Sequence, residues 1–122
     1  MPTREHIEKT VRLYVDAVGR QDLEATLALF AEDARQEDPV GTPANVGLDA
    51  IRGFFERAYR GSFTTTLTGP LLVTGDHAAV HFTIEVPTGS AGSGGDPMIV
   101  RVVDLIRFDG DGLIADLRAV VD

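Results

Sequence analysis

The sequence of 122 residues lacks cysteine altogether and is poor in histidine. Without cysteine it can form neither a disulfide framework nor a thiolate metal site. Its three histidines are His6, His77 and His81, and none of them is spaced with a cluster of carboxylates as a set of metal ligands would be. We therefore expect no metal and no cofactor.

The chain also lacks any apolar run long enough to span a bilayer, and its first residues do not have the pattern of a signal peptide. Acidic residues outnumber basic ones by 19 to 11, which gives a formal net charge of −8. Nucleic acids and anionic membranes bind basic surfaces, so neither is an expected partner. We expect a soluble cytoplasmic protein with a single domain over residues 1–122, because the chain is too short for two cores.

Apolar residues in the first half of the chain recur with the spacing of helices. The spacing predicts a helix capped by Thr3 that runs to about residue 20, a second over 22–33, and a third that Asn45 or Gly47 opens and Gly61 ends. In the first helix the apolar stripe consists of Ile7, Val11, Tyr14 and Val18. Tyr14 is therefore expected to point inward with the aliphatic side chains.

From Ser62 onward the period changes to two, which is typical of strands. The expected strands cover residues 62–68, 71–74, 77–86, 98–108 and 113–121, with a hairpin turn over 109–112 and a flexible Gly-rich loop over 87–95. One face of the last strand is expected to hold Leu113, Ala115, Leu117, Ala119 and Val121. Helices followed by mostly antiparallel strands predict an α+β domain in which a curved sheet wraps around three N-terminal helices.

The strand predicted over residues 98–108 contains an unusually placed acid. With period two, one of its faces holds Met98, Val100, Val102, Asp104, Ile106 and Phe108. Arg101 and Arg107 lie on the other face, so Asp104 is alone among apolar side chains. An ionised carboxylate there is costly, and Asp104 must therefore be paired or keep its proton. A carboxylic acid that is neutral at pH 7 is a hydrogen-bond donor.

Two further polar residues are candidates for the same site. Pro39 holds Asp38 in an extended conformation at the end of a short strand, and Tyr14 points inward from the first helix. Taken singly, Tyr14 is also consistent with a residue that only fills the core, and Asp38 is consistent with a solvated acid in a loop. Together with Asp104 they suit enolisation, the removal of a proton α to a carbonyl. A phenol and a neutral acid can donate to the oxyanion, and an ionised carboxylate can move the proton.

At these residues the sequence resembles the bacterial ketosteroid isomerases, the steroid Δ5-isomerases of the nuclear-transport-factor-like cone fold. The similarity covers nearly the whole chain. The matching segments are Arg12-Leu-Tyr14-Val, Leu29-Phe-Ala-Glu-Asp33-Ala, Glu37-Asp38-Pro-Val-Gly41, Ala50-Ile-Arg-Gly-Phe54, Val103-Asp104-Leu-Ile-Arg-Phe108 and Leu117-Arg-Ala.

The resemblance implies a cone-like sheet, a steroid substrate and a homodimer. It implies that Asp38 takes the proton from carbon 4 of a 3-oxo-Δ5-steroid and returns it to carbon 6, while Tyr14 and protonated Asp104 donate to the dienolate oxygen. The candidates for the apolar lining of the substrate pocket are Val18, Phe54, Phe55, Val86, Met98, Val100 and Phe108. Some members of the family have further tyrosines bonded to the oxyanion-hole tyrosine. Phe30 and Phe55 stand at those positions here, and Tyr59 is a possible replacement.

Other functions on the same fold remain open at this point. A polyketide-cyclase-like enzyme would use a similar acid–base arrangement on another ring system, and a non-catalytic module would only bind a hydrophobic ligand. The three polar residues favour catalysis, since a mere binder has no need of a buried acid. An epoxide hydrolase would need an Asp-Arg-Asp set, and Arg101 and Arg107 are expected on the face opposite Asp104.

Overall fold

The computed structural model describes residues 2–87 and 96–122. In chain order its elements are α1 (Arg4–Gly19), α2 (Leu23–Leu27), β1 (Phe30–Glu37), β2 (Asn45–Val46), α3 (Leu48–Ala58), β3 (Thr64–Leu67), β4 (Leu72–Thr74), β5 (His77–Val86), β6 (Met98–Phe108) and β7 (Ile114–Val121). The loop predicted over 87–95 falls, apart from its first residue, outside the described residues. None of the described helices is long and apolar enough to cross a membrane.

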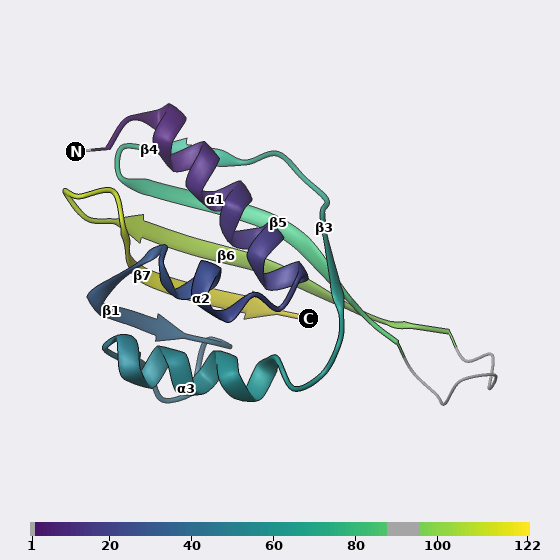
Figure 1. The fold of residues 1–122 in the computed structure, drawn as a ribbon. Coiled ribbons are helices and arrows are strands. Elements are labelled where there is room, and N and C mark those ends of the chain that lie inside the picture. The colour runs from purple at the N-terminus through teal and green to yellow at the C-terminus, as the bar shows by residue number, and fades with distance from the viewer. Residues whose placement is uncertain (1, 88–95) are drawn as a thin grey trace.

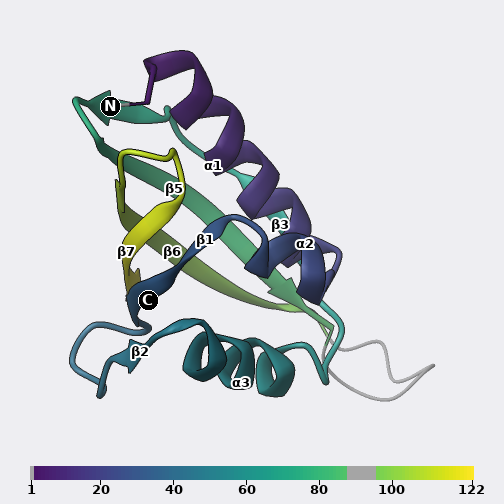
Figure 2. The ribbon, with the colours of Figure 1, turned by 60° about the vertical axis from the view of Figure 1, so that its left-hand side comes forward.

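The strands form one mixed sheet in the order β2-β1-β7-β6-β5-β3, and β4 also pairs with β5. All pairs are antiparallel except β1 with β7, which is parallel. Figures 1 and 2 show that this sheet is strongly curved and does not close. Helix α1 packs against β3, β4 and β5, while α3 packs against β1 and β2. The predicted α+β class, with a curved sheet around helices, is confirmed.

Local sequence accounts for most of these elements. The Thr3 side chain caps α1 by accepting a hydrogen bond from the His6 backbone N–H at 3.1 Å. The apolar stripe of α1 is buried as predicted, and Tyr14 is only 3% exposed. The alternation predicted for the β6 strand is also confirmed, since Val102, Asp104, Ile106 and Phe108 are buried whereas Arg101 and Arg107 are exposed.

The second predicted helix is wrong in its extent. Helix α2 ends at Leu27, and the residues from Phe30 to Glu37 form the strand β1. These residues have no strong strand preference of their own, but β1 lies between β2 and β7 and pairs with both. Phe30, Ala34 and Gln36 are thereby buried. Tertiary pairing overrides the local helix preference here.

The face predicted for the last strand is wrong at its start, for Leu113 and Ala115. Ile114 is fully buried and pairs with Phe108, whereas Ala115 is only half-buried. The register of β6 and β7 shifts between Arg107 and Phe108, which leaves one extra residue on β7. Such a bulge reverses the alternation on one side of it. Leu117 and Ala119, beyond the bulge, are buried as predicted.

The junction of α1 with β3 gives a direct test of this packing. A Cβ atom on Gly19 would overlap Thr65 Oγ1 and lie 3.2 Å from the Thr65 backbone nitrogen. Thr65 cannot move away freely, because its hydroxyl donates to the Val15 carbonyl at 2.8 Å. We expect Gly19→Ala to lower the free energy of unfolding by about 1–3 kcal/mol in urea denaturation.

Gly53→Ala in α3 is the matched control. A Cβ there meets nothing closer than Arg57 Nη1 at 3.5 Å, so we expect a gain of up to about 1 kcal/mol from helix propensity. A Gly19→Ala protein as stable as the wild type would contradict the close approach of α1 to β3.

Candidate active site

Strand register places Asp38 and Asp104 in one row across the sheet. Asp104 of β6 pairs with Ala119 of β7. On the other side of β7, Gln36 pairs with Leu117, and the Val40 N–H donates to the Ala119 carbonyl at 2.8 Å. Asp38 therefore lies beside Ala119. Two strand spacings separate the two acids, about 10 Å between their Cα atoms, and the small Ala119 side chain lies between them.

Tyr14 reaches the same region from α1. Its ring packs edge-on against Phe30 and Phe55, with ring centroids 5.9 Å and 6.5 Å away. Such edge contacts are favourable for aromatic pairs and hold the ring in place. No hydrogen-bond partner of the Tyr14 hydroxyl is found among residues 2–87 and 96–122, so its proton is available to a ligand.

All three polar residues line one cavity of about 280 Å³. Five of the apolar candidates line it with them, namely Val18, Phe54, Phe55, Val86 and Val100. The remaining lining residues were not predicted to line the cavity; they are Ala58, Tyr59, Phe63, Phe82, Ile84, Val102 and Val121. Alternation along β5 and β6 could have found Phe82, Ile84 and Val102, because they share the inner face. Phe63 lies between α3 and β3, where no periodic pattern marks it.

Two predicted lining residues lie elsewhere. Met98 is 52% exposed at the start of β6, where the β5–β6 hairpin extends beyond the helices (Figure 1). Phe108, at the other end of β6, is 1% exposed and belongs to the closed core. Both side chains are on the strand face that was predicted. A period of two predicts the face of the strand on which a residue lies. It does not predict where along the strand the cavity begins and ends, and this decides whether the side chain reaches the cavity.

In the part of the chain that the structure describes, Asp104 forms no ion pair. It is 2% exposed, and within the described residues its Oδ1 atom accepts or donates no hydrogen bond. Burial, and secondly the charge of Asp38, raise the pKa of Asp104 well above its usual range. Of the two possibilities that the sequence left open, a paired or a protonated acid, the structure favours the protonated one.

The pKa values of Asp38 and Tyr14 are also raised. Burial raises the pKa of Asp38 to about 6, so most of this carboxyl is ionised at pH 7. The pKa of Tyr14 is raised well above its ordinary value by burial. Further causes are the charges that Asp104, Asp38 and Tyr59 carry at the high pH where a tyrosine loses its proton. The cavity thus presents one base and two proton-bearing donors, which is the set that enolisation requires.

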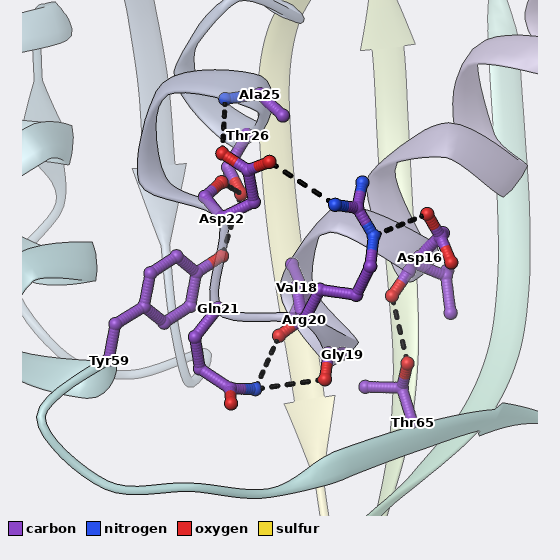
Figure 3. Close-up of polar contacts among 11 residues, drawn as sticks. Asp16, Val18, Gly19, Arg20, Gln21, Asp22, Ala25, Thr26, Tyr59 and Thr65 are labelled. Carbon is purple, nitrogen blue, oxygen red and sulfur yellow. Dashed lines mark hydrogen bonds and ion pairs between the residues drawn. The ribbon is translucent and has the colours of Figure 1, made fainter.

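Tyr59 does not supply the missing tyrosine contact to Tyr14. Its hydroxyl lies 2.8 Å from Thr26 Oγ1, on the side of α2, as Figure 3 shows. Tyr14 is surrounded instead by the phenyl rings of Phe30 and Phe55. Within the described residues, its orientation therefore depends on packing and not on a hydrogen-bond network.

Residues 11–117 match the SnoaL-like domain, and the chain belongs to this family. It is 34% identical over 113 residues to a Steroid Delta-isomerase of Nocardioides simplex. The aligned region covers 93% of this chain and 87% of that protein. The resemblance to ketosteroid isomerases is thus confirmed at the level of the family.

A second relative is the Epoxide hydrolase LasB of Streptomyces lasalocidi, 32% identical over 120 residues. The match covers 95% of this chain but only 42% of LasB. The chain therefore spans less than half the length of this relative.

The unpartnered carboxyl predicts that Asp104 is not needed for stability. We expect Asp104→Leu to be folded and at least as stable as the wild type at pH 7, with a gain of up to about 3 kcal/mol in the free energy of unfolding. Burial raises the pKa of Asp104 in the folded protein, whereas the unfolded chain releases this proton at about pH 4. The contribution of Asp104 to the free energy of unfolding should therefore fall as pH rises from about 4 toward neutrality, so the stability of Asp104→Leu relative to the wild type should increase over this range.

Asp109→Leu is the matched control, because Asp109 Oδ1 accepts from the backbone N–H groups of Asp111 and Leu113 at 2.9 and 3.0 Å. Chemical denaturation between pH 4 and 8 should show a loss of stability for this variant. A large loss in Asp104→Leu instead would mean that Asp104 holds the fold together.

Proposed function

We propose that this protein is a cofactor-independent isomerase that converts 3-oxo-Δ5-steroids to 3-oxo-Δ4-steroids. The single observation that supports this most is the pair of acids in one row. Asp104 is buried, and its Oδ1 has no hydrogen-bond partner among the described residues, whereas burial raises the pKa of Asp38 to about 6. Two acids whose surroundings separate their pKa values can act as proton donor and base at the same pH. The name of the Nocardioides simplex relative agrees with this reaction.

The proposed reaction has two proton transfers. The Asp38 carboxylate takes the proton from carbon 4, and the electron pair moves toward the carbonyl to form a dienolate. The hydroxyls of Tyr14 and of neutral Asp104 donate to its oxygen, where they stabilise the developing negative charge in a site with few other polar groups. Asp38 then returns the same proton to carbon 6, and the double bond has moved from carbons 5 and 6 to carbons 4 and 5.

The cavity suits a flat hydrophobic ligand, because apart from the three polar residues and Tyr59 its lining is apolar. Hydrolysis, the activity that the name of LasB gives, has less support. No arginine lines this cavity within the described residues. Arg101 and Arg107 are exposed on the outer face of β6, so neither can hold a water molecule between the two acids.

Removal of the base should separate chemistry from binding. We expect Asp38→Asn to lower the rate constant for conversion of 5-androstene-3,17-dione by about 10²- to 10⁴-fold, measured by the ultraviolet absorbance of the conjugated product. Binding of a planar phenol that mimics the dienolate should be kept or become tighter, since Tyr14 and Asp104 still donate. Loss of phenol binding together with activity would point to a structural role of Asp38.

The neighbouring acid provides the control for this variant. Glu37 is adjacent in sequence, but its Oε1 accepts from the Gly41 N–H at 2.9 Å, and this bond lowers its pKa. Glu37→Gln should retain turnover. In the wild type, kcat/KM should fall as pH decreases through about 6, where Asp38 gains its proton. A profile that is flat through this range would exclude Asp38 as the base.

We also propose that the protein is a homodimer, as the family resemblance implies. The outer sheet face exposes Ile99, Leu105 and Val120, which are 46–52% exposed. Multi-angle light scattering should give twice the chain mass for the wild type and the mass of one chain for Leu105→Glu. Leu13 on α1 is equally exposed, at 46%, so Leu13→Glu should remain a dimer. A monomeric wild type would contradict the proposal.

A further inference from the structure

The junction between α1 and α2 fixes the direction of Tyr59. Thr26 is fully buried, and its hydroxyl donates to the Asp22 carbonyl at 2.7 Å. Because this hydroxyl has one hydrogen, the contact of 2.8 Å between Thr26 Oγ1 and the Tyr59 hydroxyl is donated by Tyr59. Figure 3 shows the Tyr59 hydroxyl directed at α2. The hydroxyl is thus bound to the scaffold, and the ring lines the cavity.

The same junction holds Phe63, the other aromatic residue at this end of the cavity. Gln21 has a left-handed backbone conformation, with φ of 50°. Its side-chain amide donates to the Phe63 carbonyl at 2.9 Å, and also to the Val18 and Gly19 carbonyls at the end of α1. The rings of Tyr59 and Phe63 lie with their centroids 6.2 Å apart. We call these two rings the aromatic wall.

Sheet register shows that Phe63 is remote from Asp104. Val100 lies four residues before Asp104 on β6, about 13 Å along the strand. Val100 pairs with Ile84, and Ile84 pairs with Thr65 of β3. Phe63 comes two residues before Thr65, so it lies at the level of Val100 or beyond. Phe63 therefore faces the part of a ligand that is farthest from the carbonyl held by Tyr14 and Asp104. The ring of Tyr59 packs against Phe63 and against Phe55, with centroids 6.2 Å and 5.3 Å away.

We propose that Tyr59 determines specificity for multi-ring ligands, with Thr26 as the residue that positions its ring. The ring contacts the rings of the ligand that are remote from the reacting carbonyl, and it does so only while its hydroxyl is bonded to Thr26. This inference rests on the proposed function for the identity of the ligand. A one-ring ketone held at Asp38 and Asp104 does not reach the aromatic wall, and its conversion is independent of Tyr59.

The test compares 5-androstene-3,17-dione with 3-cyclohexen-1-one, a one-ring ketone of the same reactive type. We expect Thr26→Val and Tyr59→Phe each to raise KM for the steroid by about three- to tenfold, as loss of one hydrogen bond allows, with kcat unchanged. The double variant should be no worse than either single one, because both remove the same bond. The kinetic constants for the one-ring ketone should not change.

Thr10→Val on α1 is the control for the loss of a buried threonine hydroxyl. Thr10 is 5% exposed and donates to the His6 carbonyl at 2.8 Å, and it does not line the cavity. This variant should leave both substrates unaffected. Equal changes for steroid and one-ring ketone in Thr26→Val would show a general structural effect and overturn the proposal. Unchanged steroid kinetics in Tyr59→Ala would also overturn it, since the ring would then not touch the ligand.

Binding experiments separate this inference from the proposed reaction. A four-ring phenol and phenol itself, which has one ring, both offer an oxygen to Tyr14 and Asp104 without any turnover. Thr26→Val should weaken binding of the four-ring phenol by about three- to tenfold and leave binding of the one-ring phenol unchanged, even if the protein does not convert the steroid. Equal weakening of both phenols would contradict the role of Tyr59, whatever reaction the protein catalyses.

Discussion

The parallel pairing of β1 with β7 is the contact on which the site depends. It continues the sheet from β6 across β7 to β1, and it puts Asp38 in the same row as Asp104 with Ala119 between them. A shift of two residues in this register would move Asp38 by about 7 Å along the sheet. A shift of one residue would turn its side chain to the outer face. The two acids could then not reach the carbon and the oxygen of one substrate at the same time.

Unequal burial gives these two acids different chemistry. Asp104 lies in the middle of β6, between neighbouring strands, and is cut off from water. Asp38 lies just after the end of β1, where it is only partly covered. The same low-polarity surroundings that keep Asp104 protonated also strengthen the hydrogen bonds that it and Tyr14 can give to a dienolate. An acid without a partner lowers stability, so its presence in a core is better explained by function than by folding.

The sequence was sufficient to predict features that depend on one element at a time. Alternation alone placed Asp104 on the buried face of β6, and the helical stripe placed Tyr14 inward. Features that depend on contacts between different elements of the chain could not be predicted in this way. The change from α2 to β1 near Phe30 follows from pairing with β7, and the burial of Ile114 follows from a bulge. The direction of Tyr59 depends on Thr26, which is 33 residues away in sequence.

The protonation states of Asp104 and Asp38, neutral and ionised respectively, can be measured by infrared spectroscopy on protein labelled with ¹³C at the aspartate carboxyl. The difference between wild type and Asp104→Leu at about pH 7.5, where Asp38 is ionised, isolates the signal of Asp104. The structure predicts the carbonyl stretch of a protonated carboxylic acid, present in the wild type and missing in the variant. A difference spectrum that contains only carboxylate bands would show that Asp104 is ionised, and it could then not donate to a dienolate.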